Sequence, residues 1–404
     1  MEIGPILRAM TRNKIGAILI ALQIAFTMTV VVNAYFMIEE RMRLMERPSG
    51  VVEDQLFHIS TRGFTPDFNG KVSVQDDLAL LRQTPGIVDA VAINAIPLSG
   101  GGWSMSLQVE PGDGEQGHGV AIYMVDDHGL DTLGVELIAG RDFTPADVRE
   151  RGPATSDWPD KAIISEATVK ALWADANPLE VVGRTAYIND DEPVTIIGVV
   201  EKLQAPWNGW TTVEQSMLVP DKLIWTGVRY MVRTEPGRRD EMMPIVEELL
   251  ARSNNQRIVR APESMAETRA RSYALDSGLA KILGVIMAML VSITSLGIVG
   301  LASFSVRRRT KQIGIRRALG AKKRDILRYF LVENFMITTL GVVLGAVMTV
   351  GFNVWLVQAL NFPKIDWLYV PIGMLALWLI GIIAVLGPAR RATAVPPAVA
   401  TRTV

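Results

Sequence analysis

Cysteine is absent from this chain of 404 residues. A chain without cysteine forms no disulfide and no thiolate metal site, so its folded parts must be held together by their apolar cores. Histidine is scarce as well, and His58, His118 and His128 form neither an H-E-x-x-H motif nor any close pair. We therefore predict no metal site.

Motifs that carry catalysis are missing too. The sequence holds no G-x-x-x-x-G-K-[ST] motif, so it lacks a nucleotide-hydrolysing P-loop of its own. It holds no G-x-S-x-G motif, and its paired carboxylates at 126–127 and 190–192 are adjacent in sequence, which is typical of solvated turns. We predict a non-enzymatic chain with no catalytic residue and no cofactor bound directly.

Charged residues are missing from four long stretches, which run from Ile15 to Ile38, Ile282 to Val306, Asn334 to Pro363 and Trp367 to Ala389. An α-helix needs about 20 apolar residues to cross a hydrocarbon core of roughly 30 Å, and all four stretches are long enough. A helix of this length in a soluble protein would show a charged face. We predict four transmembrane helices, at 15–38, 282–306, 329–360 and 367–389.

The first stretch could instead belong to a cleaved signal peptide. Signal peptides have apolar regions of about 7–15 residues, followed by small residues at the cleavage site. Here the uncharged stretch is longer and runs into the large side chains of residues 35–38. A retained first helix is therefore the better interpretation.

The charges between the helices are distributed unevenly. Residues 307–328 carry ten basic side chains against Asp325, and the segments 1–14 and 390–404 are also basic. We expect residues 1–14 to form a cytoplasmic interfacial helix. Residues 39–281 carry 24 Lys and Arg against 38 Asp and Glu, a net charge of −14. Because basic segments stay on the cytoplasmic side, we predict that both termini are cytoplasmic and that residues 39–281 lie outside.

The large region 39–281 alternates strand-like and helix-like runs bounded by Gly, Pro, Asn and Asp. This pattern indicates an α+β domain. Strands are expected at 51–59, 87–95, 104–109, 120–125, 162–165, 194–200 and 229–233, and helices at 74–83, 166–173 and 241–253. From Glu263 a continuous helix is expected to run to Val306, with a break at Ser277-Gly278 as the alternative. The predicted fold class is thus a four-helix membrane domain with an α+β extracytoplasmic domain inserted between helices 1 and 2.

Small and polar residues inside the membrane helices predict contacts between helices, because they allow close approach and hydrogen bonding there. Gly341 and Gly345 form a G-x-x-x-G pair on the third helix, for which packing within the chain is the alternative to dimerisation. We expect a dimer contact on helices one and two instead. Its candidate residues are Gln23, Thr27, Asn33, Ser292 and Ser295.

The segment 307–333, RRRTKQIGIRRALGAKKRDILRYFLVE, combines basic residues with an apolar I-G-I-x-x-A-L-G-A core. A positive-inside loop would explain the charge but has no need of the apolar core. We expect a short cytoplasmic helix that is stopped by Gly320, a residue suited to the position after a helix end. Its apolar residues Ile313, Ile315 and Leu319 are predicted to dock on a protein.

This segment resembles the MacB/FtsX/LolC-type permeases of ATP-binding cassette (ABC) systems, in which it reads approximately E-R-x-x-E-I-G-I-x-R-A-x-G-A. Arg308 and Gln312 stand where the family tends to have glutamate. The matching residues are Arg309, Ile313, Gly314, Ile315, Arg317, Ala318, Gly320 and Ala321. The resemblance extends along the chain, through Leu133-Gly134-Val135, Ala139-Gly140-Arg141-Asp142-Phe143, Ile196-Ile197-Gly198 and Pro388-Ala389-Arg390-Arg391-Ala392.

The resemblance implies a permease in the cell inner (cytoplasmic) membrane, with a cytoplasmic coupling segment at 307–328 and a MacB-like periplasmic core domain and stalk at 39–281. It implies two copies of an ABC ATPase, which would supply ATP and Mg²⁺, and a second permease subunit as a homodimer or related heterodimer. A periplasmic adaptor or substrate protein is a further possible partner. The implied ATPase-coupling residues are Gln312, Ile313, Gly314, Ile315, Arg316, Arg317, Leu319, Gly320 and Ala321.

Three functions follow as alternatives. The first is a permease that exports or extracts a substrate by mechanical transmission of ATP hydrolysis to the periplasmic domain. The second is an FtsX-like signalling permease that controls a periplasmic partner without moving cargo. The third is a membrane-anchored receptor without any ATPase. Nothing in the sequence favours interaction with nucleic acid.

Overall fold

The computed structural model describes residues 14–112, 117–189, 191–360 and 362–394. It divides into two units. A helical unit is formed by Met1–Met45 with Asp276–Val404, and an α+β unit by Glu46–Leu275. Residues 1–13 of the interfacial helix predicted at 1–14 and the last ten residues of the tail lie outside the described residues.

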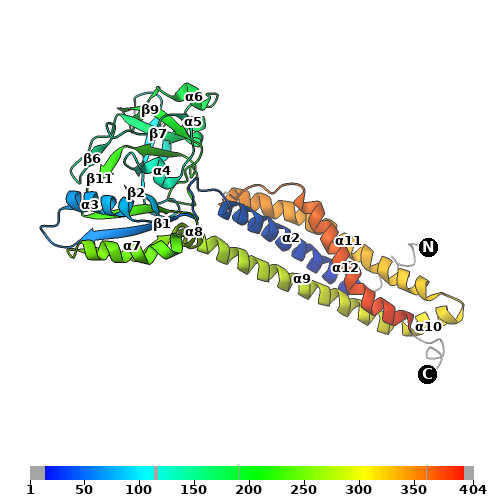
Figure 1. Ribbon diagram of the computed structural model, residues 1–404. Coiled ribbons are helices and arrows are strands. Elements are labelled where there is room, and N and C mark those ends of the chain that lie inside the picture. The colour runs from blue at the N-terminus through cyan, green and yellow to red at the C-terminus, as the bar shows by residue number, and fades with distance from the viewer. Residues whose placement is uncertain (1–13, 113–116, 190, 361, 395–404) are drawn as a thin grey trace. The chain divides into compact units, whose positions relative to one another are not determined.

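Among its described residues, the helical unit contains four helices that are long and apolar enough to cross a membrane. They are α2 (Lys14–Met45), α9 (Ala274–Arg308), α11 (Lys323–Leu360) and α12 (Tyr369–Thr393), shown in Figure 1. Each of them extends beyond both ends of the uncharged stretch that predicted it, with the exceptions of the end of α11 and the start of α12. The predicted four-helix membrane domain is confirmed.

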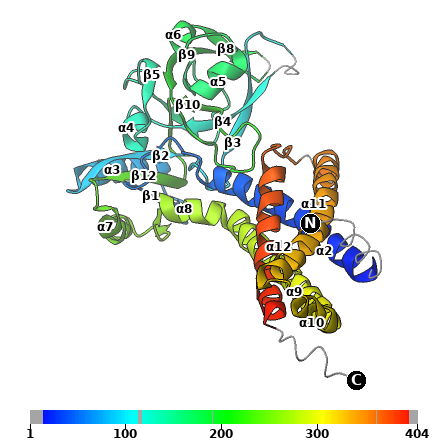
Figure 2. The same cartoon turned by 90° about the vertical axis from the view of Figure 1, so that its right-hand side faces the viewer.

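The middle helix of the packed group is α11, which contacts both α2 and α12 (Figures 1 and 2). Gly341 and Gly345 lie in its contact with α2. A Cβ atom at Gly341 would stand 2.7 Å from the carbonyl oxygen of Ala21, and one at Gly345 would stand 2.8 Å from Cβ of Met28. The G-x-x-x-G pair therefore packs within the chain, which was the alternative to dimerisation.

The α+β unit begins with a five-stranded antiparallel sheet. Its order is β13 (Arg257–Val259), β1 (Leu56–Gly63), β12 (Gly227–Thr234) and β2 (Ile87–Ile93), and β14 (Glu263–Ser264) also pairs with β1. Helices α3 (Gly70–Gln83) and α7 (Arg239–Ser253) cover one face of it. Their shared core contains Phe57, Ile59, Leu78, Tyr230 and Val246.

A second sheet of seven strands completes this unit. Its order is β5 (Leu137–Gly140), β9 (Glu192–Val200), β7 (Lys161–Ser165), β10 (Ser216–Val219), β4 (His118–Met124), β3 (Trp103–Gln108) and β8 (Thr185–Ile188). Because β8 also pairs with β9, six of these strands form a closed ring. Short helices α4 (Gly129–Leu133), α5 (Glu166–Leu172) and α6 (Pro178–Val181) and the pair β6 (Arg149–Arg151) and β11 (Asp221–Leu223) complete the unit.

An apolar core joins the two sheets within the α+β unit. Val91 and Met231 of the five-stranded sheet and Ala121, Tyr123 and Leu218 of the seven-stranded sheet belong to the same cluster of buried side chains. The Tyr123 hydroxyl donates a hydrogen bond to the carbonyl oxygen of Gln204. Burial raises the pKa of this tyrosine well above its ordinary value. The predicted α+β domain is confirmed.

The helix expected to run from Glu263 to Val306 is wrong in two respects. Residues 263–264 are a strand, and α8 (Met265–Ser272) begins after a capping box between Ser264 and Glu267. Tyr273, with φ −99° and ψ 14°, then separates α8 from α9. Its ring is buried and its amide still donates to the carbonyl of Arg269. The alternative break at Ser277-Gly278 is also wrong, because both residues lie within α9.

Candidate functional site

The short basic helix expected after the second membrane helix is present as α10 (Thr310–Ala318). Gly320 has a φ of +98°, a left-handed conformation that ends the helical path at little cost for glycine. The amide of Lys322 then donates to the carboxylate of Asp325 at 3.0 Å, at the start of α11. The chain therefore turns sharply between α10 and α11.

Arg309, the residue just before α10, is held by α11. Its guanidinium forms two hydrogen bonds to the carboxylate of Glu333, with Nη1–Oε2 at 2.8 Å and Nη2–Oε1 at 3.0 Å. Nη1 also lies 3.0 Å from the hydroxyl of Tyr329. The side chains of Arg309 and Glu333 are only 19% and 11% exposed. Such a bidentate pair fixes both distance and orientation, so it fixes the end of α9 to α11.

The two faces of α10 differ in burial. Ile313 is 4% exposed and lies in a core with Ile326 and Phe330 of α11. Ile315 is 48% exposed and Leu319, just after the helix, is 83% exposed. One apolar residue therefore anchors α10 to its own unit, while two remain on the surface. The prediction that Ile313 docks outward together with them is corrected by its burial.

The remaining predicted coupling residues surround these three. Gln312 is exposed and lines a small cavity with Arg309 and Tyr329. Arg316 places its guanidinium 5.3 Å from the centre of the Tyr329 ring. Gly314 is buried, Arg317 donates to the carbonyl oxygen of Thr393 at 2.9 Å, and Ala321 is half-buried. The structure thus brings all nine predicted residues together around one turn.

Glu333 and Tyr329 were missed by the sequence analysis. A signal for Glu333 exists, because Asp325 and Glu333 are the two acids among residues 307–333, and Glu333 directly precedes an uncharged stretch. An isolated carboxylate at such a place is costly unless it is paired. Tyr329 gives no comparable signal, since tyrosine is common at the ends of membrane helices.

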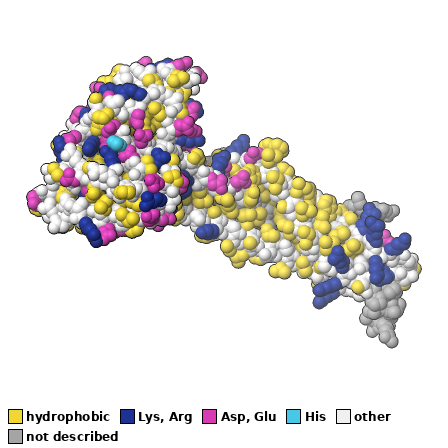
Figure 3. All heavy atoms as spheres, viewed as in Figure 1, with side chains coloured by type: hydrophobic (Ala, Val, Ile, Leu, Met, Phe, Trp, Pro, Cys, Tyr) yellow, Lys and Arg dark blue, Asp and Glu magenta, His cyan; other side chains and the backbone are white. Residues whose placement is uncertain are grey.

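Basic side chains gather at this end of the helical unit. In Figure 3 hydrophobic side chains cover the middle of the unit, and Lys and Arg side chains cluster toward α10. Exposed members of the cluster are Arg307, Arg308, Lys311, Arg316, Lys322, Lys323, Arg324 and Arg328. This distribution is the one expected of a membrane protein whose α10 end faces the cytoplasm.

The polar residues predicted to form a dimer contact are mostly used within the chain. Thr27 is buried, with its Oγ1 2.7 Å from Oγ1 of Thr294. Asn33 is buried and donates to the carbonyl of Thr29 at 2.9 Å. Gln23 is half-buried and lies against Gly297 of α9. These three residues are thus not on a free surface of the chain, since partners on its own helices cover them.

Helix α9 nevertheless leaves much of its surface free. Ser292 is exposed and Ser295 is half-buried, and each hydroxyl bonds a carbonyl one turn earlier in the same helix. Large apolar residues of α9 are exposed as well, among them Ile282, Val285, Met289, Ile293, Leu296 and Phe304. A partner at α2 and α9 stays a prediction. The apolar span of α9 is the least buried of the four membrane helices.

Two family models match the chain. Residues 15–271 match the MacB-like periplasmic core domain, and residues 284–397 match the FtsX-like permease C-terminal region. The chain belongs to the MacB/FtsX family of ABC transporter permeases. The resemblance stated from residues 307–333 is therefore confirmed. As a MacB/FtsX permease, the protein has four membrane spans and a periplasmic or extracellular domain, which is the α+β unit.

Relatives of this MacB/FtsX permease include a protein described as a permease and others described as ATP-binding/permease proteins. It is 26% identical over 291 residues to the uncharacterized ABC transporter permease YknZ of Bacillus subtilis, covering 69% of this chain and 68% of that one. It is 24% identical over 283 residues to the macrolide export ATP-binding/permease protein MacB of Campylobacter jejuni, covering 65% of this chain and 41% of MacB. The alignment thus spans less than half of MacB.

Two solved structures align with about half of the chain. The extracellular domain of YknZ aligns at 17% identity with a TM-score of 0.32, over 50% of this chain and 99% of that domain. The periplasmic region of MacB from Actinobacillus actinomycetemcomitans aligns at 15% identity with a TM-score of 0.33, over 54% of this chain and 94% of that region.

Proposed function

We propose that this permease couples ATP hydrolysis by a separate cytoplasmic ATPase to movement of its periplasmic domain, for export or extraction of a substrate. The observation that supports it is the division of α10 and its end into an anchored and an exposed side. Ile313 and the Arg309–Glu333 pair hold the helix on α11, whereas Ile315 and Leu319 are exposed among arginines and lysines. An apolar pair at a water-facing, basic surface fits an acidic-rimmed apolar cleft on a partner.

The proposal requires a defined orientation in the cell inner (cytoplasmic) membrane. The basic cluster around α10 belongs in the cytoplasm, together with both termini, and the acidic region 39–281 belongs in the periplasm. Reporter fusions after Ala154 and after Ala321 test this directly. The first should be active only as an external reporter and the second only as a cytoplasmic one, and the reverse pattern would refute the proposed orientation.

The partners follow from this arrangement. Two ATPase copies would bring ATP and Mg²⁺, and a second permease, identical or related, would complete the membrane part by covering the exposed face of α9. An ATPase that closes on ATP would move the segment around Gly314, and α9 would carry that movement across the membrane. A periplasmic adaptor or substrate protein would meet the α+β unit.

The proposed docking of the ATPase is tested by substitutions at two exposed residues and by one control substitution. Ile315→Asp or Leu319→Asp places a charge in the proposed apolar contact, where an unpaired charge is costly. We expect either variant to remain folded in the membrane but to lose co-purification with the ATPase. Lys311→Ala, on the same helix and also exposed, should retain it. Retention of the ATPase by both Asp variants would eliminate this docking surface.

A signalling permease that controls a periplasmic hydrolase is the second candidate, because an anchored coupling helix would serve it equally well. The two functions separate by what stimulates ATP turnover of the permease–ATPase complex. A small molecule, peptide or lipoprotein that stimulates turnover supports transport. Stimulation by a purified hydrolase, together with activation of that hydrolase, supports signalling.

A further inference from the structure

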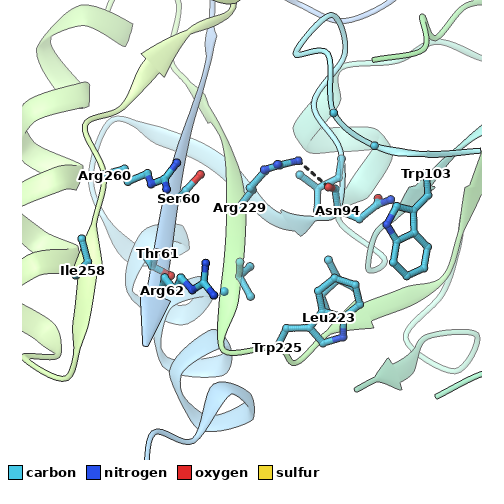
Figure 4. Close-up of a pocket in the computed structure, with 15 residues that line it drawn as sticks. Ser60, Thr61, Arg62, Asn94, Trp103, Leu223, Trp225, Arg229, Ile258 and Arg260 are labelled. Atoms are coloured by element: carbon cyan, nitrogen blue, oxygen red, sulfur yellow. Dashed lines mark hydrogen bonds between the residues drawn. The ribbon is translucent and has the colours of Figure 1, made fainter. Parts of the chain in front are cut away.

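A cavity of about 440 Å³ opens in the α+β unit beside the end of the five-stranded sheet. Strands β1 and β12 supply Ser60, Arg62 and Arg229 to its wall, and Arg260 follows β13. On the other side of the cavity lie Trp103 of β3 and Trp225, as Figure 4 shows. Cavities of about 300–1,000 Å³ are typical of sites for small molecules.

The strand pattern explains why arginines gather here. Alternate residues of a strand face opposite sides of its sheet. On β1, Leu56 faces the core between the two sheets, whereas Phe57 and Ile59 face the helices. Arg62 therefore shares the face of Leu56, at the far end of the strand. This face of β1 is therefore apolar at Leu56 and cationic at Arg62.

The neighbouring strand β12 repeats this change. On β12, Met231 lies in the core between the sheets, and Arg229 is two residues away on the same face. Arg229 pairs in register with Ser60, and the amide of Arg260 donates to the carbonyl of Ser60 at 2.9 Å. Three arginines from three segments thus border one cavity, at the point where the core between the sheets ends.

These arginines have no acidic partner in the cavity. None of its lining residues is Asp or Glu, and among the ion pairs of the described residues none involves Arg62, Arg229 or Arg260. Nearby arginines behave differently, since Arg257 pairs with Asp77 and Arg271 with Glu263. Nη1 of Arg229 donates a 2.9 Å hydrogen bond to the carbonyl oxygen of Asn94. Three arginines around one cavity whose lining holds no acidic residue favour the binding of an anion.

The opposite wall is aromatic. The ring centres of Trp103 and Trp225 lie 5.7 Å apart with their planes at 41°, and Leu223 adds apolar surface beside Trp225. Ile258, which pairs with Arg62 in the sheet, adds apolar surface on the side of the arginines. Guanidinium groups bind carboxylate and phosphate through paired hydrogen bonds, and tryptophan rings pack against flat apolar groups. We propose that this cavity binds a small organic anion with an aromatic body, such as an aryl phosphate or aryl carboxylate.

Binding is measured on the full chain in nanodiscs of phosphatidylcholine, without any ATPase, so the result does not depend on the proposed coupling. The probe is 1-naphthyl phosphate, titrated by calorimetry against empty nanodiscs as a blank. We expect one site per chain, with inorganic phosphate weaker by about tenfold or more, because it lacks the ring. 1-Naphthylmethylamine, a cation with the same ring, should not bind. Absence of naphthyl phosphate binding, or equal binding of the amine, would overturn the proposal.

Variants of the cavity arginines test whether the ligand binds in this cavity. Arg62→Gln with Arg260→Gln removes two exposed cavity charges and should weaken naphthyl phosphate by about tenfold or more. The matched control, Lys170→Gln with Arg252→Gln, removes the same net charge from exposed helix positions of the same unit and should leave affinity unchanged. Equal losses in both double variants would mean attraction to the net charge of the unit and would refute a defined site.

A third variant tests the cavity without changing charge. Gly227 lies opposite Arg62 in the sheet, and a Cβ added there would meet Cγ of Arg62 at 3.7 Å, an ordinary contact. Gly227→Leu should therefore fold and fill part of the cavity, which weakens naphthyl phosphate while the thermal unfolding midpoint stays that of the parent. An unchanged affinity in this folded variant would place the ligand elsewhere.

Discussion

Arg309 and Glu333 are 24 residues apart in sequence and form a bidentate ion pair, with both N–O distances at or below 3.0 Å. The pair joins the residue between α9 and α10 to the third membrane helix. Any force on α10 therefore reaches α11 through this contact as well as through the backbone. In the proposed coupling, the pair makes α10 a rigid attachment instead of a loose loop.

We predict that Glu333→Gln lowers the stability of the helical unit, because it leaves the guanidinium of Arg309 partly buried without a counter-charge. The expected cost is about 2 kcal/mol. Arg309→Lys keeps the charge but loses the paired geometry, so it should cost less. Thermal unfolding of the full chain in detergent measures both. A Glu333→Gln variant as stable as the parent would show that the pair does not hold α10.

Neighbouring isoleucines on α10 should behave oppositely. Ile313→Ala removes a side chain buried against Ile326 and Phe330, with an expected loss of about 2–4 kcal/mol. Ile315→Ala shortens an exposed side chain, so the stability should change by less than about 0.5 kcal/mol. In an ATPase pull-down only Ile315→Ala should weaken binding at full stability. Equal stability of the two variants would contradict the assignment of the two faces.

Much of the fold was predictable because its signals are local. Uncharged stretches predicted all four membrane helices, and alternation predicted β2, β3, β4, β7, β9 and β12 to within two residues at most ends. The helix α3 was predicted to begin at residue 74, but it begins at Gly70, where Asn69 caps the amide of Val72. Short strands such as β10 and β13 were not predicted, because four or three residues are too few to show an alternation of apolar and polar side chains.

The candidate site was predictable in position but not in orientation. The I-G-I run showed that a helix would have an apolar side, yet only packing against Phe330 decides that Ile313 and not Ile315 is buried. The prediction that polar residues of the membrane helices form a dimer contact was wrong for Thr27 for the same reason, because packing decides which residues meet. Thr27 and Thr294 are 267 residues apart, and nothing in the sequence around either shows that they pair.

Glycines of α11 offer a test of the helix packing. Gly341→Ala would place a methyl group 2.7 Å from the carbonyl oxygen of Ala21, so the helices must separate, at a cost of about 1–3 kcal/mol. Gly351→Ala on the same helix meets nothing within 4 Å and should be neutral. Thermal unfolding of both variants in detergent provides the comparison. If Gly351→Ala were as destabilising as Gly341→Ala, helix flexibility and not close packing would explain the effect.

Two aspartates of the α+β unit should respond to pH in opposite directions. Burial, reinforced by the nearby carboxylates of Asp131 and Asp127, raises the pKa of Asp142 to about 6. The folded chain therefore binds this proton more tightly than the unfolded chain. The stability it contributes is complete below about pH 4 and is lost as the pH rises through 6. In contrast, hydrogen bonds from Arg141, Lys161 and Thr144 hold the pKa of Asp147 well below its usual range.

Asp142→Asn removes the carboxyl that must ionise in its buried place, and an amide oxygen can still accept the 2.6 Å hydrogen bond from the Phe143 amide. Its unfolding temperature should therefore exceed that of the parent at pH 8 and equal it near pH 4.

Asp147→Asn loses a carboxylate stabilised in the folded state, so it should be less stable than the parent at pH 8. That deficit should shrink only below about pH 4, as the parent's own Asp147 becomes protonated. Circular dichroism of the full chain in detergent at both pH values measures the two differences. Parallel shifts of the two variants would contradict the opposite environments, because a general effect of removing negative charge from an acidic domain would move both in the same direction.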